Sequence, residues 1–193
     1  MSCVCNLRLV SESDVRAGAG PVGADAVIPP RVSAVASWAR LALMRLRARG
    51  RLQAGRGVRV AHGAHVHAEA GVRLGDGCLL GAGCRIEAVG GPVRIGAGAR
   101  IGERSVIVAL AGITVGDEAV VGEWAVLSDA YPDAPDVESP VRKQPLFALP
   151  IDVGARARIG AHAALGAGAR ISPGSVVPSY AVVPTPAAPP TSP

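Results

Sequence analysis

The 193-residue chain is poor in aromatic residues, which make up 3% of it, and it contains a single lysine, Lys143. So few aromatic rings are poor material for an ordinary globular core, in which such rings supply much of the buried area. No apolar run reaches the roughly 18 residues of a membrane-spanning helix, and no charged-then-apolar secretory leader is visible. We therefore expect a soluble cytoplasmic protein.

The sequence is instead rich in glycine and small aliphatic residues, and these follow a six-residue repeat. Within each block an aliphatic residue recurs every six positions, and a small residue stands four positions after it. The aliphatic positions are Val60, Val66, Leu74, Leu80, Ile86, Ile95, Ile101, Ile107, Val115, Val121, Leu127, Val153, Ile159, Leu165, Ile171, Val177 and Val183. Steps of eight or nine residues separate the early blocks.

A period of six fits neither an amphipathic helix nor simple strand alternation. It is typical of an all-β solenoid in which each hexapeptide forms one side of a triangular coil. The aliphatic residues are then expected to stack inward, with Leu74, Ile95, Val115 and Val153 in one column. Three hexapeptides make one coil, so the sequence predicts about six coils, enough to bury a continuous core.

The four cysteines do not form a disulfide framework. Cys78 and Cys84 occupy the small inward position of the repeat, so we expect them to be buried, reduced thiols. Cys3 and Cys5 have a C-x-C spacing without a second ligand pair nearby, so no zinc site is expected there. His62, His65 and His67 cluster in the first coil, but two side chains at most share a strand face, so surface histidines are favoured over a metal site.

The period divides the chain into three parts. Residues 1–50 form an N-terminal extension with a basic helix at about 31–49, residues 51–183 form the β-helix domain, and residues 184–193 form a proline-rich tail. The repeat is interrupted at 128–152 by a segment with five prolines and several acids. We interpret this segment as a functional loop, because long loops in compact domains are usually functional or disordered.

The basic helix has two interpretations. Between Ala26 and Ala68 there are eight arginines and no acidic residue. A helix that covers the open first coil with its apolar face, arginines toward solvent, is favoured, because solenoid ends need caps. Contact of the basic helix with a membrane surface is the alternative, and nucleic-acid binding is not expected. The apolar residues predicted to share the capping face are Val32, Ala36, Ala39, Leu43 and Leu46.

The repeat from Ile95 to Gly122, the turn at Trp124, the loop and the return at Val153 together resemble the hexapeptide-repeat acyltransferases. The nearest branch is the galactoside, maltose and cell-surface-sugar O-acetyltransferases. The resemblance implies a left-handed parallel β-helix, against the usual right-handed rule for crossovers. It also implies a homotrimer that binds acetyl-CoA or another acyl-CoA between subunits, without a metal, and acylates a sugar or small-molecule acceptor.

The resemblance also implies a set of site residues. In this family a loop histidine acts as general base toward the acceptor hydroxyl; Pro132 stands at that position here. The remaining candidates for proton transfer are His162, Asp129 and Tyr131. The implied donor-binding residues are Arg158, Gly160, Ala161 and Ala181, and the implied acceptor-binding residues are Trp124, Arg142 and Gln144. Because the loop histidine is missing, the alternative is a catalytically lapsed homologue that serves as a binding or scaffold subunit.

Overall fold

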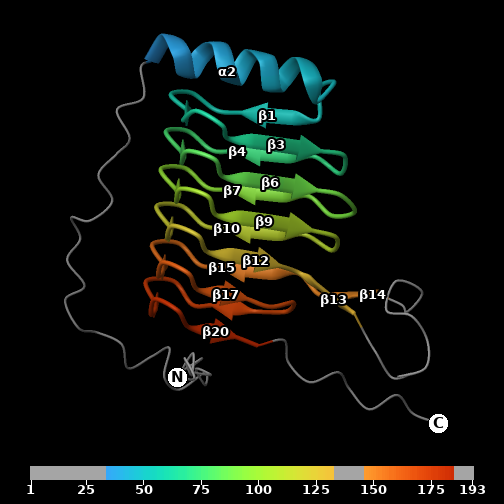
Figure 1. Cartoon of the computed structure of the whole chain (residues 1–193), viewed down its shortest axis with the longest axis vertical. Helices are drawn as coiled ribbons and strands as arrows, with labels where there is room; N and C mark the ends of the chain where they lie inside the picture. Colours follow the sequence, from blue (N-terminus) through green and yellow to red (C-terminus); the bar gives the residue numbers. More distant parts are fainter. Residues whose placement is uncertain (1–33, 133–145, 185–193) are drawn as a thin grey trace, which may run out of the picture.

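The structure is a computed structural model that describes residues 34–132 and 146–184. Helix α2 (Ala34–Arg47) lies across one end of a three-sided prism, and the chain winds from there to the other end (Figure 1). Each side of the prism is a parallel sheet of six strands, so the described residues form six coils. This confirms the predicted left-handed β-helix with an N-terminal helix.

The three sides are named here in the order in which the chain visits them. Face 1 consists of β1 (Leu52–Ala54), β4 (Val72–Leu74), β7 (Val93–Ile95), β10 (Ile113–Val115), β15 (Ile151–Val153) and β18 (Arg170–Ile171). Face 2 consists of β2 (Arg59–Val60), β5 (Leu79–Leu80), β8 (Arg100–Ile101), β11 (Val120–Val121), β16 (Arg158–Ile159) and β19 (Val176–Val177). Face 3 consists of β3 (His65–Ala68), β6 (Arg85–Ala88), β9 (Val106–Ala109), β12 (Val126–Ser128), β17 (Ala164–Leu165) and β20 (Val182–Val183). An antiparallel hairpin of β13 (Ala130–Pro132) and β14 (Leu146–Ala148) projects from the prism (Figure 1).

The core is built from columns of equivalent residues in successive coils. Leu74 pairs with Ile95, Ile95 with Val115, and Val115 with Val153, and all four side chains are buried. The small series is buried as well, as the fully covered Ala119 shows. The stacked aliphatic column that the repeat predicts is therefore confirmed.

Glycine after the aliphatic residue has a steric cause that lies in the next coil. A Cβ added to Gly122 would lie 2.6 Å from the backbone nitrogen of Ala161, one coil further along the axis. Coils stack at the strand spacing of about 4.8 Å, which leaves no room for a side chain pointing along the axis at this corner. The repeat therefore requires glycine there for close backbone approach.

The helix caps the first coil, but with a different face from the one predicted. Leu41 and Ser37 are buried against the coil, whereas Leu43 and Leu46, which were expected to cover it, are exposed. The predicted capping face was therefore wrong for Ala39, Leu43 and Leu46, while Val32 lies outside the described residues.

The physical reason is that the open edge of the first coil presents polar backbone groups. Ser37 Oγ accepts a hydrogen bond from the Val60 N–H at 2.8 Å, and the Arg40 guanidinium donates to the Val60 carbonyl at 3.1 Å. Arg45 donates to the Ala54 carbonyl at 2.6 Å. Unpaired backbone groups at a covered edge need hydrogen-bond partners, so a face with serine and arginine covers this edge better than an apolar one.

Both cysteines of the repeat lie in the core. Cys78 and Cys84 are free and buried, as predicted. Burial raises the pKa of each thiol from 9.0 to about 12, because the charged thiolate is poorly solvated in the core. Neither thiol is therefore a nucleophile at neutral pH.

Candidate functional site

Four side chains from successive coils stack on the corner between faces 2 and 3, which we call the aromatic corner: Arg104, Trp124, His162 and Tyr180. The Arg104 guanidinium lies 5.0 Å from the centre of the Trp124 ring. The Trp124 and His162 ring centres are 6.1 Å apart with an angle of 5° between planes, and those of His162 and Tyr180 are 4.8 Å apart with an angle of 3°. The corner thus carries a ladder of parallel rings.

Every member of the aromatic corner has a left-handed backbone conformation. The φ angles are 52° at Arg104, 56° at Trp124, 58° at His162 and 60° at Tyr180. The first two coils have Gly63 at φ 68° and Gly83 at φ 65° at this corner. A left-handed conformation costs a residue with a Cβ roughly 1–2 kcal/mol. Glu118 and Arg156 have the same conformation at the corner between faces 1 and 2, with φ angles of 56° and 58°, so the conformation belongs to the coil corners and the ring stack alone distinguishes the aromatic corner.

His162 presents a usable imidazole at this corner. Its side chain is exposed, while Trp124 and Tyr180 stack on its two ring faces. The two ring nitrogens lie on the edge of the ring, so stacking fixes the plane and leaves the nitrogens open to a ligand. Imidazole is the side chain best suited to proton transfer near neutral pH. The backbone holds the residue in place, because the His162 N–H donates to the Glu123 carbonyl at 2.8 Å.

The predicted donor-binding residues lie beside His162, with different surroundings. Arg158 is exposed on the outer surface of β16. Ala181 is buried, so its methyl group belongs to the core. A Cβ on Gly160 would collide with the backbone nitrogen of Ser179, so this glycine serves coil stacking.

Asp129 lies at the point where the chain leaves the prism, and its carboxylate is fully buried. Oδ1 accepts a hydrogen bond from the Leu110 N–H at 2.7 Å. Oδ2 accepts from the N–H groups of Ala111 at 2.8 Å and Gly112 at 2.6 Å. The carboxylate therefore holds the corner of the preceding coil, directly above the root of the hairpin.

Tyr131 lies in the hairpin, opposite Phe147 on β14, and the two rings stack at 6.0 Å. The Leu149 N–H donates to the Asp129 carbonyl at 2.9 Å and closes the base of the hairpin. The hairpin thus projects from the corner between faces 3 and 1. Arg142 and Gln144, the predicted acceptor-binding residues, lie outside the described residues.

The predicted site residues thus fall into two groups at opposite ends of face 3. Trp124 and His162 come together at the aromatic corner and Arg158 lies on the adjoining face 2, whereas Asp129 and Tyr131 lie at the hairpin. Asp129 follows Trp124 by five positions along the chain, which at about 3.3 Å per position is roughly 16 Å. One chain therefore does not bring its histidine and its hairpin into one site.

Between the two groups, the outer surface of face 3 is apolar. Val106, Val126, Ala164 and Val182 occupy one outward column in the last four coils. Val126 is 42% exposed. The equivalent positions of the first two coils are His65 and Arg85.

Sequence reasoning missed Arg104 and Tyr180 as members of the aromatic corner. A signal was present, because Arg104, Trp124 and His162 all stand two residues after a corner glycine, and Tyr180 occupies the same place after Pro178. Only the register of the coils turns this sequence equivalence into a stack.

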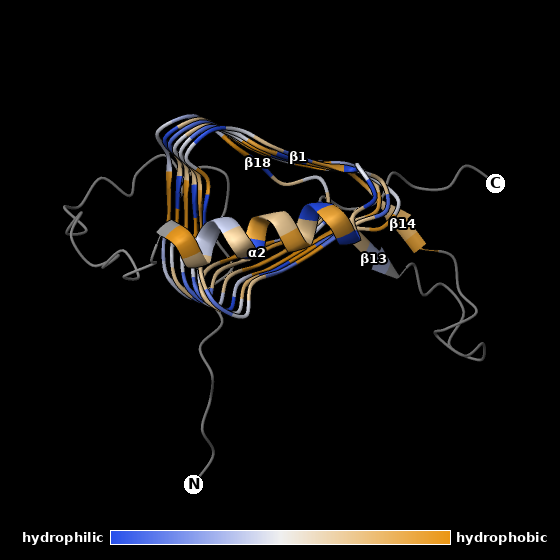
Figure 2. Cartoon of the chain, turned by 90° about the horizontal axis from the view of Figure 1, so that it is seen from above, coloured by the Kyte–Doolittle hydropathy of each residue, from blue (hydrophilic) through white to orange (hydrophobic). Residues whose placement is uncertain are grey.

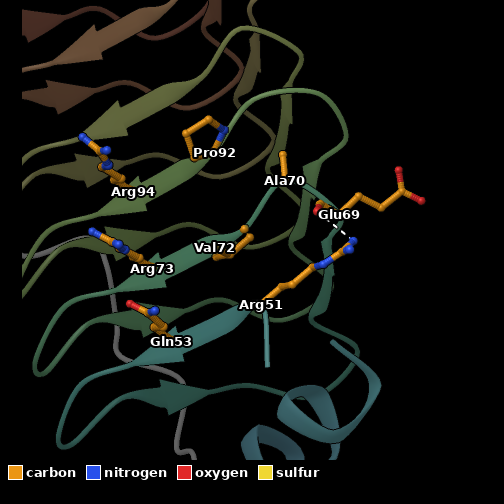
Figure 3. Close-up of a pocket in the computed structure, with 9 residues that line it drawn as sticks. Arg51, Gln53, Glu69, Ala70, Val72, Arg73, Pro92 and Arg94 are labelled. Atoms are coloured by element: carbon orange, nitrogen blue, oxygen red, sulfur yellow. Dashed lines mark hydrogen bonds between the residues drawn. The ribbon is translucent and has the colours of Figure 1, made fainter. Parts of the chain in front are cut away.

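A second surface feature, a hollow of about 350 Å³, lies on face 1 near the α2 end. The outward side chains of Gln53, Arg73 and Arg94 line it from β1, β4 and β7, and they point the same way in Figure 3. Arg51 donates to the Glu69 carbonyl at 3.0 Å at its edge. None of the predicted site residues lies there, so we place the candidate site at face 3.

The first-coil histidines do not form a metal centre. His67 Nε2 lies 3.1 Å from a carboxylate oxygen of Glu69. Within residues 34–132 and 146–184, no group of three or more histidine, cysteine, aspartate or glutamate side chains is placed to hold a metal ion.

The repeats match a known family model. Residues 55–88 and 92–123 match the hexapeptide repeat of succinyl-transferase, which is less than half of the chain. No curated protein matches the sequence.

Solved structures of AntD, an N-acyltransferase from Bacillus cereus, are similar in fold. A single-residue variant of AntD in complex with dTDP and coenzyme A gives a TM-score of 0.58 at 17% identity, over 68% of this chain and 74% of that chain. AntD in complex with dTDP and 3-hydroxybutyryl-CoA gives a TM-score of 0.51 at 16% identity, again over 68% and 74%. At such low identity the likeness shows the fold alone.

Proposed function

We propose that the protein is an acyl-CoA-dependent acyltransferase that modifies a hydroxyl or amine of a sugar or small metabolite, with His162 as general base. The observation that carries the proposal is the exposed His162 imidazole, held between two aromatic rings at a strained corner. Asp129 is not the preferred base, because three backbone N–H groups already occupy its buried carboxylate.

The proposed reaction needs one proton acceptor and one donor of an acyl group. A nitrogen of His162 takes the proton from the acceptor as its oxygen or nitrogen attacks the thioester carbonyl. The carbon–sulfur bond then breaks, and the CoA thiolate leaves and takes up the proton from the imidazolium. We propose that Arg158, exposed on β16 in the same coil as His162, contacts the negatively charged phosphates of the donor.

The site is proposed to lie between subunits of a homotrimer. The apolar outer surface of face 3 separates the aromatic corner, at Trp124, from the root of the hairpin, at Asp129, by roughly 16 Å within one chain. A second chain packed against that surface would cover the exposed Val126 and bring its own hairpin toward the aromatic corner. This packing of two chains would explain why the two groups of predicted site residues lie apart within one chain.

The AntD structures support the choice of ligands to test. These are complexes of AntD with coenzyme A or 3-hydroxybutyryl-CoA together with dTDP. A prism of this fold can therefore hold an acyl-CoA and a nucleotide group. We infer that nucleotide-linked amino sugars belong in the acceptor panel beside free sugars.

A second candidate function is that of a binding or scaffold subunit without catalysis. Two observations favour it: Pro132 replaces the expected loop histidine in β13, and Asp129 is fully engaged by the backbone. Such a protein would keep the coil stacking and the aromatic corner but transfer nothing.

An assay of thiol release from acetyl-CoA and longer acyl-CoAs, over that acceptor panel, tests the proposal. Wild type is expected to release CoA only when an acceptor is present. His162→Ala should lower turnover about 100-fold or more, the usual contribution of a general base. His65→Ala, an exposed histidine in the first coil, is the control and should leave turnover unchanged.

Turnover that survives His162→Ala would contradict the assignment of the base. Binding of CoA without any transfer by wild type would favour the second candidate function. In that case Pro132→His is the sharper test, because a gain of turnover would show that only the loop base had been lost.

A further inference from the structure

The outward side of α2 is apolar. Val35 is 78% exposed, Trp38 72% and Leu46 77%, and Leu43 is exposed as well. With the intervening alanines these residues form the outer face of the helix, turned away from the prism. Figure 2 looks down on this side, where hydrophobic segments lie along the helix. We use the term outer face for Val35, Trp38, Ala39, Ala42, Leu43 and Leu46.

Capping does not account for this apolar face. The opposite side of α2 covers the first coil through Ser37, Leu41 and Arg40, including hydrogen bonds to backbone groups of Val60. Four large apolar side chains therefore remain on the outside of one 14-residue helix. Contiguous exposed apolar surface of this kind usually marks an interaction site.

The surroundings of the outer face are strongly basic. From Ala34 to Ala68 the chain has seven arginines and no acidic residue. Arg47 lies in the last turn of α2 and Arg49 follows the helix, whereas Arg40, Arg45 and Arg51 donate to backbone carbonyls of the prism. An occupant must therefore offer apolar surface at its centre and negative charge at its rim. A bilayer of anionic lipids has both, because acyl chains lie directly below charged phosphate groups.

The placement of α2 suits a flat surface. The helix lies across the extreme end of the prism, so its outer face points along the prism axis (Figure 1). Its 14 residues span about 21 Å, less than the roughly 30 Å of a hydrocarbon core. Among the described residues, no helix is long and apolar enough to cross a membrane. A helix of this size can lie in the interface, where tryptophan is enriched.

We propose that the outer face of α2 docks on an anionic lipid bilayer, with its apolar side chains at the acyl boundary and the nearby arginines on phosphate groups. The prism then stands away from the membrane. The coil of His162 is four strands below β2, which at about 4.8 Å per coil places the aromatic corner roughly 19 Å from the capped end. The proposal does not depend on acyl transfer.

Flotation of the full chain with lipid vesicles tests the proposal. Phosphatidylcholine vesicles with and without one quarter phosphatidylglycerol are compared, at low and at high salt. We expect binding to the anionic vesicles only, weakened by salt because the arginine contribution is screened. In a Trp124→Phe background, in which Trp38 is the sole tryptophan, its emission should shift to the blue on binding.

The double variant Val35→Glu/Leu46→Glu should weaken vesicle binding by at least about tenfold. Both side chains are exposed, so the fold should be kept, which far-UV circular dichroism checks. Val89→Glu, an exposed apolar residue outside α2 on a corner of the second coil, is the matched control and should bind as wild type does.

Three results would overturn the proposal. Wild type would fail to float with anionic vesicles, it would bind neutral and anionic vesicles alike, or the double variant would bind as well as wild type. Self-association of wild type that the double variant abolishes, without vesicle binding, would show that a second copy of the chain covers the outer face instead.

Discussion

The hydrogen bonds of Asp129 indicate that this residue has a structural role. Its two carboxylate oxygens accept three backbone hydrogen bonds from the corner at 110–112, and its own carbonyl closes the hairpin. A loop inserted into a solenoid interrupts the backbone ladder, so the corner above it loses its usual partners. A buried carboxylate is a compact way to supply the missing acceptors.

Asp129→Asn is therefore expected to destabilise the protein. The amide group replaces one oxygen by a donor, so at least one buried backbone N–H loses its partner. The free energy of unfolding should fall by about 1–3 kcal/mol, measured by urea denaturation. Asp152→Asn, on an exposed side chain of β15, is the control and should change it little. An unchanged unfolding midpoint in Asp129→Asn would contradict the assigned role.

The buried thiols predict a loss of stability at alkaline pH. The folded-state pKa of Cys78 and Cys84 is about 12, whereas an unfolded thiol has its ordinary value of 9.0. The thiol contribution is complete below pH 9 and is lost as pH rises toward 12, because only the unfolded chain ionises in that window.

At pH 10.5 each thiol should lower the free energy of unfolding by about 2 kcal/mol relative to pH 8. Urea denaturation at the two pH values measures the change. In Cys78→Ala/Cys84→Ala the change between the two pH values should be much smaller, although the cavities lower stability at both. An equal change in the variant and in wild type would mean that other groups cause it.

At the scale of the element, α2 shows how a β-helix is closed at its first coil. The Ser37 hydroxyl accepts the Val60 N–H at 2.8 Å, and two arginines reach backbone carbonyls of β1 and β2. The cap thus continues the hydrogen bonding of the solenoid with side chains.

Ser37→Ala should therefore leave a buried backbone N–H without a partner. We expect the free energy of unfolding to fall by about 1–3 kcal/mol, measured by thermal or urea denaturation. Ser172→Ala, on an exposed corner, is the matched control. Equal stability of the two variants would mean that the cap holds the coil by apolar contact through Leu41 alone.

The elements also show what the sequence could and could not predict. The six-residue period was enough to predict the coils, the inward columns and the buried thiols, because equivalent residues pack in the same way in every coil. The capping face of α2 was predicted wrongly. The prediction used only the spacing of apolar residues, whereas the edge of the coil that α2 covers has backbone groups that need hydrogen-bond partners. Arg104 and Tyr180 became site candidates only when the coil register stacked them on Trp124 and His162.

At the scale of the whole molecule, the apolar column on face 3 predicts assembly. Light scattering should give three times the chain mass of 19.4 kDa. Val126→Glu should shift the protein toward the monomer, because a charge buried in the contact costs free energy without a partner. Thr114→Glu, on the outward side of face 1, should leave the assembly intact. A monomeric wild type at micromolar concentration would contradict the trimer.

We propose that the aromatic corner of one chain and the hairpin of another form one site, so that a variant of either part alone is inactive and a mixture of the two variants regains activity. His162→Ala chains are refolded together with Tyr131→Ala/Phe147→Ala chains in equal amounts, and thiol release is measured. Each site needs an intact corner from one chain and an intact hairpin from its neighbour, so random mixing predicts about a quarter of wild-type turnover. Mixed trimers, verified by mass, whose turnover does not exceed that of the separate variants would show that the site does not combine a corner and a hairpin from two chains.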